Sequence, residues 1–139
     1  MIFDSATEFG ARAAHRVWHD RLGWLSSVRP NGSPHTHQVW FYWNGASFLL
    51  FARAEQERLG NIRQNPNVTL HLESNGDGRD LVILEGQAEI LAAEPPEEEI
   101  LEYLQKYSAW LTRLNWDREF FRGLYSVPYR VTPTSVTGL

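Results

Sequence analysis

Three arginines close together in the sequence are the strongest candidates for binding chemistry. Arg53 follows an apolar run, and Arg58 and Arg63 lie in a helical pattern over residues 55–65. Asn65-Pro66 ends that pattern, because the residue before a proline avoids the helical conformation. A guanidinium offers a fork of donors and a helix start adds partial positive charge, so this segment could hold a phosphate.

The same arginines also have an ordinary explanation. They could lie on a solvated face and pair with Glu55 and Glu57, since exposed ion pairs are common and contribute little. From residue types alone the solvated face is the default interpretation. A phosphate site therefore needs support from elsewhere in the chain.

Histidine pairs are the other candidate ligands. His15 and His19 are four residues apart in a helical pattern, and His35 and His37 alternate onto one face of a strand. Neither pair has an obvious third ligand, and the first lacks the glutamate of a zinc-protease helix. The chain also has no cysteine, which removes thiolate nucleophiles and Cys-based metal sites. We predict no metal site and assign no catalytic acid, base or nucleophile.

Length and composition predict one globular domain over residues 1–139. With 42% hydrophobic residues, a chain of this size can bury roughly 68% of its unfolded surface. A formal net charge of −4 gives no general attraction for nucleic acids or anionic membranes. No run approaches about 20 apolar residues and no targeting pattern is present at the start. We expect a cytoplasmic protein with no nucleic-acid or membrane partner.

The first element that must position these side chains is a helix over residues 5–21. Ser5-Ala6-Thr7-Glu8 has the spacing of a capping box, which predicts a helix start near Ala6. Apolar residues then recur every three to four positions as far as Gly23, which is expected to end the pattern.

Two Asn-Gly steps predict a three-stranded antiparallel meander. Asn31-Gly32 and Asn44-Gly45 are each flanked by strand-forming residues. The expected strands are 24–28, 35–43 and 47–52. Both faces of the middle strand are rich in aromatic or apolar side chains, so the second face must be covered by a helix, a ligand or another subunit.

The rest of the chain supplies further strands and helices. We expect strands over 68–72, 81–91 and 125–132, a long amphipathic helix over 96–114 and a helical stretch over 117–122. Prolines and glutamates at the start of the long helix fit a helix N-terminus. The predicted fold is a six-stranded antiparallel β-barrel with flanking helices, of class α+β.

The ordered motifs resemble a known family. They are Gly-Trp-Leu-Ser-Ser-Val-Arg-Pro-Asn-Gly at 23–32, Val-Trp-Phe-Tyr-Trp-Asn-Gly at 39–45, Arg-Leu-Gly-Asn-Ile-Arg-Gln-Asn-Pro at 58–66 and Val-Ile-Leu-Glu-Gly-Gln-Ala-Glu-Ile at 82–90. Together they are similar to the pyridoxamine 5'-phosphate oxidase-like family of flavin-binding split barrels, and more closely to its small deazaflavin-dependent oxidoreductases. The resemblance implies a split barrel of the FMN-binding type.

The resemblance also implies a set of cofactor-binding residues. Arg58 would clasp the cofactor phosphate, the strand end at 51–53 would cradle the ribityl-phosphate, and the segment 36–41 would line the ring. The predicted cofactor-binding residues are Arg58, Arg53, Ala52, Phe51, Gln38, Val39, Trp40, Thr36 and Asn61.

Several positions depart from the family pattern of the true oxidase. Glu57 stands where a second basic residue is expected, and Thr36 and Phe41 replace Arg and Lys. The Arg and His that clamp the substrate have no counterpart in residues 127–139. These departures argue against pyridoxine phosphate as the ligand.

Two functions remain open from the sequence. The first is a homodimeric oxidoreductase that holds FMN, or alternatively a deazaflavin, at the dimer interface and passes a hydride to or from a small organic substrate. The alternative is a non-catalytic binding or carrier protein for a flavin, haem or tetrapyrrole, which the missing clamp favours. Binding of single-stranded nucleic acid on an aromatic barrel is disfavoured by the negative net charge.

Overall fold

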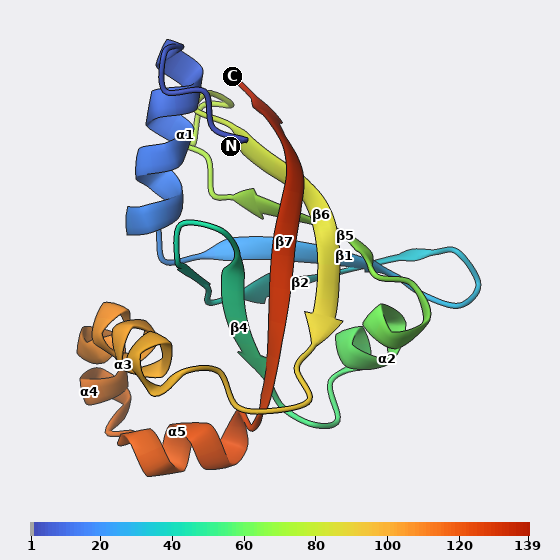
Figure 1. Ribbon diagram of the computed structural model, residues 1–139, viewed down its shortest axis with the longest axis vertical. Coiled ribbons are helices and arrows are strands. Elements are labelled where there is room, and N and C mark those ends of the chain that lie inside the picture. The colour runs from blue at the N-terminus through green and yellow to red at the C-terminus, as the bar shows by residue number, and fades with distance from the viewer. Residues whose placement is uncertain (1) are drawn as a thin grey trace.

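A curled antiparallel sheet forms the body of the protein. The structure, a computed structural model, describes residues 2–139. The sheet order is β2-β1-β5-β6-β7-β4-β3, and helices pack against its ends and side (Figure 1). The strands are β1 (Gly23–Val28), β2 (Pro34–Val39), β3 (Tyr42–Trp43), β4 (Phe48–Ala52), β5 (Asn67–Leu72), β6 (Val82–Ile90) and β7 (Val127–Gly138).

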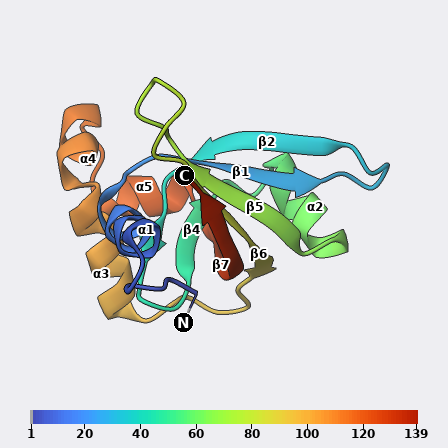
Figure 2. The same cartoon turned by 90° about the horizontal axis from the view of Figure 1, so that it is seen from above.

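The two edge strands of this sheet are consecutive in the chain. Only Trp40 and Phe41 separate β2 from β3, so the sheet must curl until its edges meet at that point. Elsewhere the edges are apart, and the β1–β2 hairpin projects to one side (Figure 2). A bulge between Glu85 and Gly86 assists the curl, and a Cβ on Gly86 would lie 2.4 Å from the Thr132 carbonyl oxygen.

The predicted strand over residues 35–43 is therefore two strands, and the barrel has seven strands rather than six. The Phe41 amide donates to the Tyr107 hydroxyl at 2.7 Å, and Lys106 Nζ donates to the Phe41 carbonyl at 2.7 Å. Because these helix side chains take both backbone groups of Phe41, the strand is interrupted there. The predicted meander is wrong, since β2 pairs with β1 and β3 pairs with β4 at opposite edges of the sheet.

Aliphatic side chains fill the interior of the curled sheet. Leu50, Leu70 and Leu84 are at most 1% exposed, as strand alternation requires for one inward face. Helix α1 (Glu8–His19) adds Ala13 and Val17 to this core. Burying each large aliphatic side chain contributes about 1.5–3 kcal/mol.

Helix α1 is shorter than the predicted range of 5–21. The Thr7 hydroxyl caps the helix by accepting from the Gly10 amide at 2.9 Å, so the capping box that begins at Ser5 is not formed. The helix ends at His19, because Asp20 already has an extended backbone. Gly23 begins β1 instead of ending the helix.

The C-terminal half differs most from expectation. The predicted helix over 96–114 is two helices, α3 (Glu97–Lys106) and α4 (Ser108–Leu114), with Tyr107 between them. A further helix, α5 (Arg118–Leu124), is capped by Asp117. The last strand continues to Gly138 instead of stopping at 132. Helix α2 (Glu57–Gln64) lies close to its predicted range.

Helices α3 to α5 cover the outer side of β4 with aromatic side chains. Their core holds Phe51, Tyr103, Tyr107 and Phe121, with Trp40 packed against it. This cover accounts for aromatic side chains that exceed what the barrel interior can hold, so their burial does not require a second subunit. Within residues 2–139, no helix combines the length and apolarity needed to span a membrane.

Candidate functional site

Arg58 is a buried cation at the start of α2. It is only 3% exposed, and its Nε donates to the Tyr129 hydroxyl on β7 at 2.9 Å. Its guanidinium carbon lies 5.7 Å from the centre of the Tyr129 ring. Burial raises the pKa of the Tyr129 phenol, although the Arg58 charge opposes the shift. The tyrosine therefore stays neutral at pH 7 and presents an oxygen to Arg58.

The charge of Arg58 is not compensated by the part of the chain that the structure describes. None of the ion pairs within 4.0 Å among residues 2–139 involves Arg58, and its Nη1 is buried without a hydrogen-bond partner. An unpaired buried ion costs several kcal/mol. An anion placed against Nη1 would recover this free energy, which makes Arg58 the most informative residue of the site.

Arg58 opens into a cavity of ≈ 190 Å³ between the barrel and the C-terminal helices. Gln38, Val39 and Trp40 line it from β2 and the segment that follows. The opposite wall comes from α4, α5 and the residues that follow them. It is formed by Leu114, Trp116, Phe121 and Tyr125. Four predicted cofactor-binding residues thus meet at one cavity.

Trp40 is a rigid wall of this cavity. Its ring stacks on Tyr107 at 4.5 Å with an interplanar angle of 8°, and lies 5.9 Å from Phe121 at 16°. Such aromatic pairs add about 0.5–1.5 kcal/mol beyond burial. Because two rings stack against it, Trp40 is held in place at the cavity wall.

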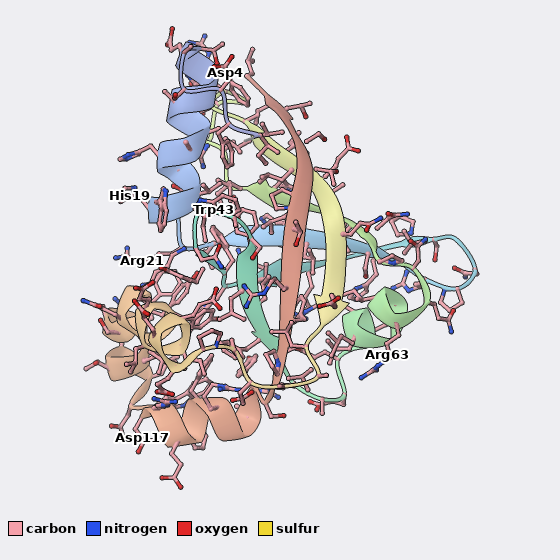
Figure 3. All side chains as sticks on the ribbon, viewed as in Figure 1. Asp4, His19, Arg21, Trp43, Arg63 and Asp117 are labelled. Carbon is pink, nitrogen blue, oxygen red and sulfur yellow. The ribbon has the colours of Figure 1, made fainter. Side chains whose placement is uncertain are left out.

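Arg53 is a second cation near the same wall. Its guanidinium carbon lies 5.3 Å from the centre of the Tyr125 ring, and its Nε is buried without a partner. Arg63 is exposed in the last turn of α2 (Figure 3). Arg58 and Tyr125 thus line the cavity, Arg53 contacts Tyr125, and Arg63 does not line the cavity.

The explanation of the arginines as a solvated face is wrong for Arg58. Glu57 pairs instead with Arg29 at 2.7 Å and contacts His35 at 3.1 Å. The Arg29 hydrogen bond is the main cause of the lowered pKa of Glu57. The acid next to Arg58 in sequence is thus occupied elsewhere and leaves Arg58 free for a ligand.

Four other predicted residues do not line the cavity. The Thr36 hydroxyl lies 2.8 Å from that of Ser26 on the exposed surface of β2. Phe51 and Ala52 are buried in the two hydrophobic cores. Asn61 donates to the Ser27 hydroxyl at 3.0 Å, an arrangement that joins α2 to β1.

The residues that sequence reasoning missed come from the C-terminal third. Tyr129 lies within the strand predicted over 125–132, yet only the pairing of β4 with β7, which sets it opposite Leu50, brings it to Arg58. Trp116 directly precedes, and Phe121 lies within, the stretch over 117–122 that was predicted to be helical. Their aromatic character was the available signal, but nothing local indicated which surface they cover.

The cavity can bind an anionic group beside an apolar one. Of its lining residues, Arg58 supplies the charge, Gln38 supplies an amide, and the others are aliphatic or aromatic. Tyr125 is the one lining side chain with a hydroxyl group. The arrangement is suited to holding a flat ligand by its phosphate, and it offers little for acid–base chemistry.

The histidine pairs do not assemble a metal site. His15 and His19 stack with ring centres 4.1 Å apart, and His35 and His37 lie 6.5 Å apart. Among the described residues, no group of three or more His, Asp or Glu side chains could hold a metal ion.

The curled antiparallel sheet and its flanking helices have the architecture of a split barrel. A family model described as pyridoxamine 5'-phosphate oxidase matches residues 11–132. The chain belongs to this family. A comparison with curated proteins finds no match to the sequence.

Solved structures of several proteins share the fold. An F420 reductase superposes with a TM-score of 0.68 at 21% identity, covering 88% of this chain and 94% of that one. An FAD-binding protein from Mesorhizobium loti gives 0.65 at 20% identity over 92% and 91% of the two chains. HutZ, the heme storage protein from Vibrio cholerae, gives 0.66 at 14% over 99% and 95%. At these identities the likeness concerns the fold alone.

Proposed function

We propose that this protein is an oxidoreductase that binds FMN or a deazaflavin through Arg58 and transfers a hydride to or from a small organic substrate. The observation that carries the proposal is the buried guanidinium of Arg58, whose Nη1 has no partner and which lines a cavity with Gln38, Val39 and Trp40. A phosphate oxygen is the ligand that such a group binds best. The FAD-binding protein and the F420 reductase among the structural neighbours support a flavin-type cofactor.

The roles of the chain's residues follow from their surroundings. Arg58 binds the phosphate, and Arg53, with its unpartnered Nε, adds positive charge close by. Trp40 and Trp116 exclude water from the apolar part of the cavity. The bound flavin or deazaflavin would supply the hydride chemistry itself, which agrees with a lining that contains no carboxylate, histidine or lysine.

A homodimer is part of the proposal. The cavity of ≈ 190 Å³ is smaller than the about 300–1,000 Å³ of a typical ligand pocket, so it accommodates the phosphate end and leaves the ring outside. The adjacent strand β2 has a free edge and exposed side chains at Thr36 and Gln38. A second copy packed near this edge would complete the ring site and cover the open strand.

Binding titrations test the proposal. FMN or the deazaflavin should quench the fluorescence of Trp40 and Trp116 and raise the melting temperature, and a Trp116→Phe variant should retain binding with less quenching. Reduced FMN should reoxidise rapidly in air, whereas reduced deazaflavin should not, which separates the two cofactors. Absence of both quenching and thermal stabilisation with either cofactor would refute the proposal.

Sedimentation measurements test the dimer separately. We expect a dimer mass with and without cofactor, and a Thr36→Lys variant on the β2 edge should weaken association more than Thr132→Lys, a substitution at an exposed position of β7. A monomer that binds the cofactor with full affinity would contradict the interface at β2.

A carrier without turnover is the second candidate. It is favoured by the same lack of acid–base groups in the cavity and by the likeness to a protein described as a heme storage protein. Neither His35 nor His37 lines the cavity, so a haem iron would have no histidine ligand within it. Steady-state hydride transfer to a quinone or enone acceptor would decide for the enzyme, and tight binding with no transfer would decide for the carrier.

A further inference from the structure

Lys106 is the only lysine of the chain, in which Lys and Arg together number 13. It lies in the last turn of α3. Its Nζ donates to the Phe41 carbonyl and lies 4.0 Å from the centre of the Phe41 ring. None of the ion pairs within 4.0 Å among residues 2–139 involves this amine. An amine in such surroundings is poorly solvated and has no counter-ion.

The amine borders a cavity of ≈ 530 Å³ that is separate from the Arg58 site. Trp18 and His19 line it from α1, Tyr42 from β3 and Glu102 from α3, with Arg21 between α1 and β1. Figure 3 shows His19 at the end of α1 and Arg21 next to the C-terminal helices. None of these residues lines the Arg58 cavity, so the proposed cofactor does not explain this one.

Burial favours the neutral form of Lys106. The pKa of Lys106 is lowered to about 7, mainly by burial; the Asp20 charge opposes this shift and the Arg21 charge adds to it. Glu102, an acid on the same helix as Lys106, accepts a hydrogen bond from the Tyr42 hydroxyl and does not pair with the amine. His19 faces the same cavity from α1. A neutral amine has the free lone pair that nucleophilic lysines need.

We propose that Lys106 is a nucleophilic amine that forms an imine with small planar aldehydes entering this cavity. The Nζ lone pair adds to the carbonyl carbon, and the former π pair stays on oxygen, which takes a proton. The nitrogen then loses its protons as water leaves and the C=N bond forms. Amine and aldehyde give imine and water, so no oxidant or reductant is needed.

The cavity wall indicates which aldehydes fit. The Trp18 side chain is 46% exposed and its ring lies 6.4 Å from that of Tyr42, which gives a flat molecule two aromatic surfaces. Arg21 offers a cation for a carboxylate on the ligand. A planar aldehyde with a carboxylate should therefore react faster than a neutral aliphatic aldehyde.

Reductive trapping of the wild-type protein tests the proposal. The protein is incubated with 4-carboxybenzaldehyde and cyanoborohydride, digested after glutamate residues, and analysed by mass spectrometry. The expected adduct is on the peptide that contains Lys106, with a half-maximal rate near the pKa of about 7. The α-amino group of Met1 lies on another peptide, so its reaction is counted separately.

A relocated lysine provides the matched control. The double variant Lys106→Arg/Arg113→Lys keeps one lysine but moves it to an exposed position of α4. At pH 7 the wild-type lysine should be labelled at least about tenfold faster, because an ordinary lysine with a pKa of about 10.4 is almost fully protonated. Arg21→Gln should slow labelling of Lys106 at pH 7.

Three outcomes would overturn the proposal. They are labelling confined to the α-amino group, a rate at Lys106 no higher than at the relocated lysine, and a half-maximal rate near pH 10. Faster labelling by propanal than by 4-carboxybenzaldehyde would refute the assignment to planar carboxylated aldehydes.

Discussion

Two arginines at neighbouring positions along β7 differ in how their charges are balanced: Arg130 belongs to the strand, and Arg58 contacts Tyr129 of the strand. Arg130 lies on the outer side of the strand, where Glu99 accepts from it at 2.8 and 2.9 Å and the Ser47 hydroxyl at 3.1 Å. Arg58 reaches Tyr129 on the other side at 2.9 Å and keeps a buried Nη1 without a partner. Within residues 2–139 the fold places a carboxylate beside the Arg130 guanidinium and none beside that of Arg58.

This difference separates a structural ion pair from a binding site. Glu99 is 8% exposed and also accepts from Asn44 at 2.8 Å, so the pair joins α3 to β7 and to the turn before β4. The interaction that would compensate the buried charge of Arg58 can come only from a group outside residues 2–139. A phosphate at Arg58 would do what Glu99 does at Arg130.

Removing the carboxylate at Glu99 should have the largest effect on stability. Glu99→Gln leaves Arg130 without its counter-ion and should lower the free energy of unfolding by about 3 kcal/mol, as breaking a buried pair does. Urea unfolding measures the change, and Glu98→Gln at the exposed neighbouring position is the control. A loss no greater than that of the control would remove the contrast between the two arginines.

Acid should reproduce part of this loss. The Arg130 hydrogen bond is the main cause of the lowered pKa of Glu99. Because the folded-state pKa lies below the unfolded value of about 4.3, the stabilisation is present above that value and is lost as pH falls through the folded pKa. Unfolding measured between neutral pH and pH 3 should show a flatter pH dependence in Glu99→Gln than in the wild type; equal slopes would contradict the assignment.

Tyr129→Phe should have an intermediate effect. The variant leaves the Arg58 Nε without an acceptor and should lower stability by about 1 kcal/mol. Tyr125→Phe, a half-buried tyrosine near the same cavity, is a suitable control by thermal unfolding. If the two variants have equal stability, the Tyr129 hydroxyl does not support Arg58.

Arg58→Met should have the smallest effect on the stability of the free protein. Replacing an unpaired buried charge by an apolar side chain of similar length is often neutral or stabilising, so we expect a change within about 1 kcal/mol of zero or a gain. Arg130→Met, measured in the same way, should be clearly destabilising because it leaves Glu99 unpaired. A large loss in Arg58→Met would make Arg58 a structural residue.

The sequence predicted the turns between strands better than the break between β2 and β3 at the edges of the sheet. The Asn-Gly turns correctly marked the ends of β1, β2, β3 and β4. The interruption at Phe41 was not predictable, because it depends on Tyr107 and Lys106, which lie more than 60 residues away along the chain. The helices that cover Trp40 could not be predicted for the same reason, because they are equally far along the chain.

The candidate site was predicted in part. Arg58 lies four residues before Ile62, and Arg63 lies four residues after Leu59, so helical spacing treats the two arginines alike. Only the family resemblance singled out Arg58, and only the tertiary fold turned it inward. Tyr129 and Trp116 could not be assigned, since their roles depend on strand pairing and helix packing rather than on local pattern.

The proposed function depends above all on the free guanidinium of Arg58 holding the phosphate of the cofactor. The most direct test is the affinity ratio of FMN to riboflavin, or of the deazaflavin with and without its phosphate-bearing tail, in the wild type and in Arg58→Met. We predict that the wild type prefers the phosphorylated ligand by at least about tenfold, or about 1.4 kcal/mol, and that Arg58→Met loses this preference while remaining folded. The same ratio in both proteins would contradict the account.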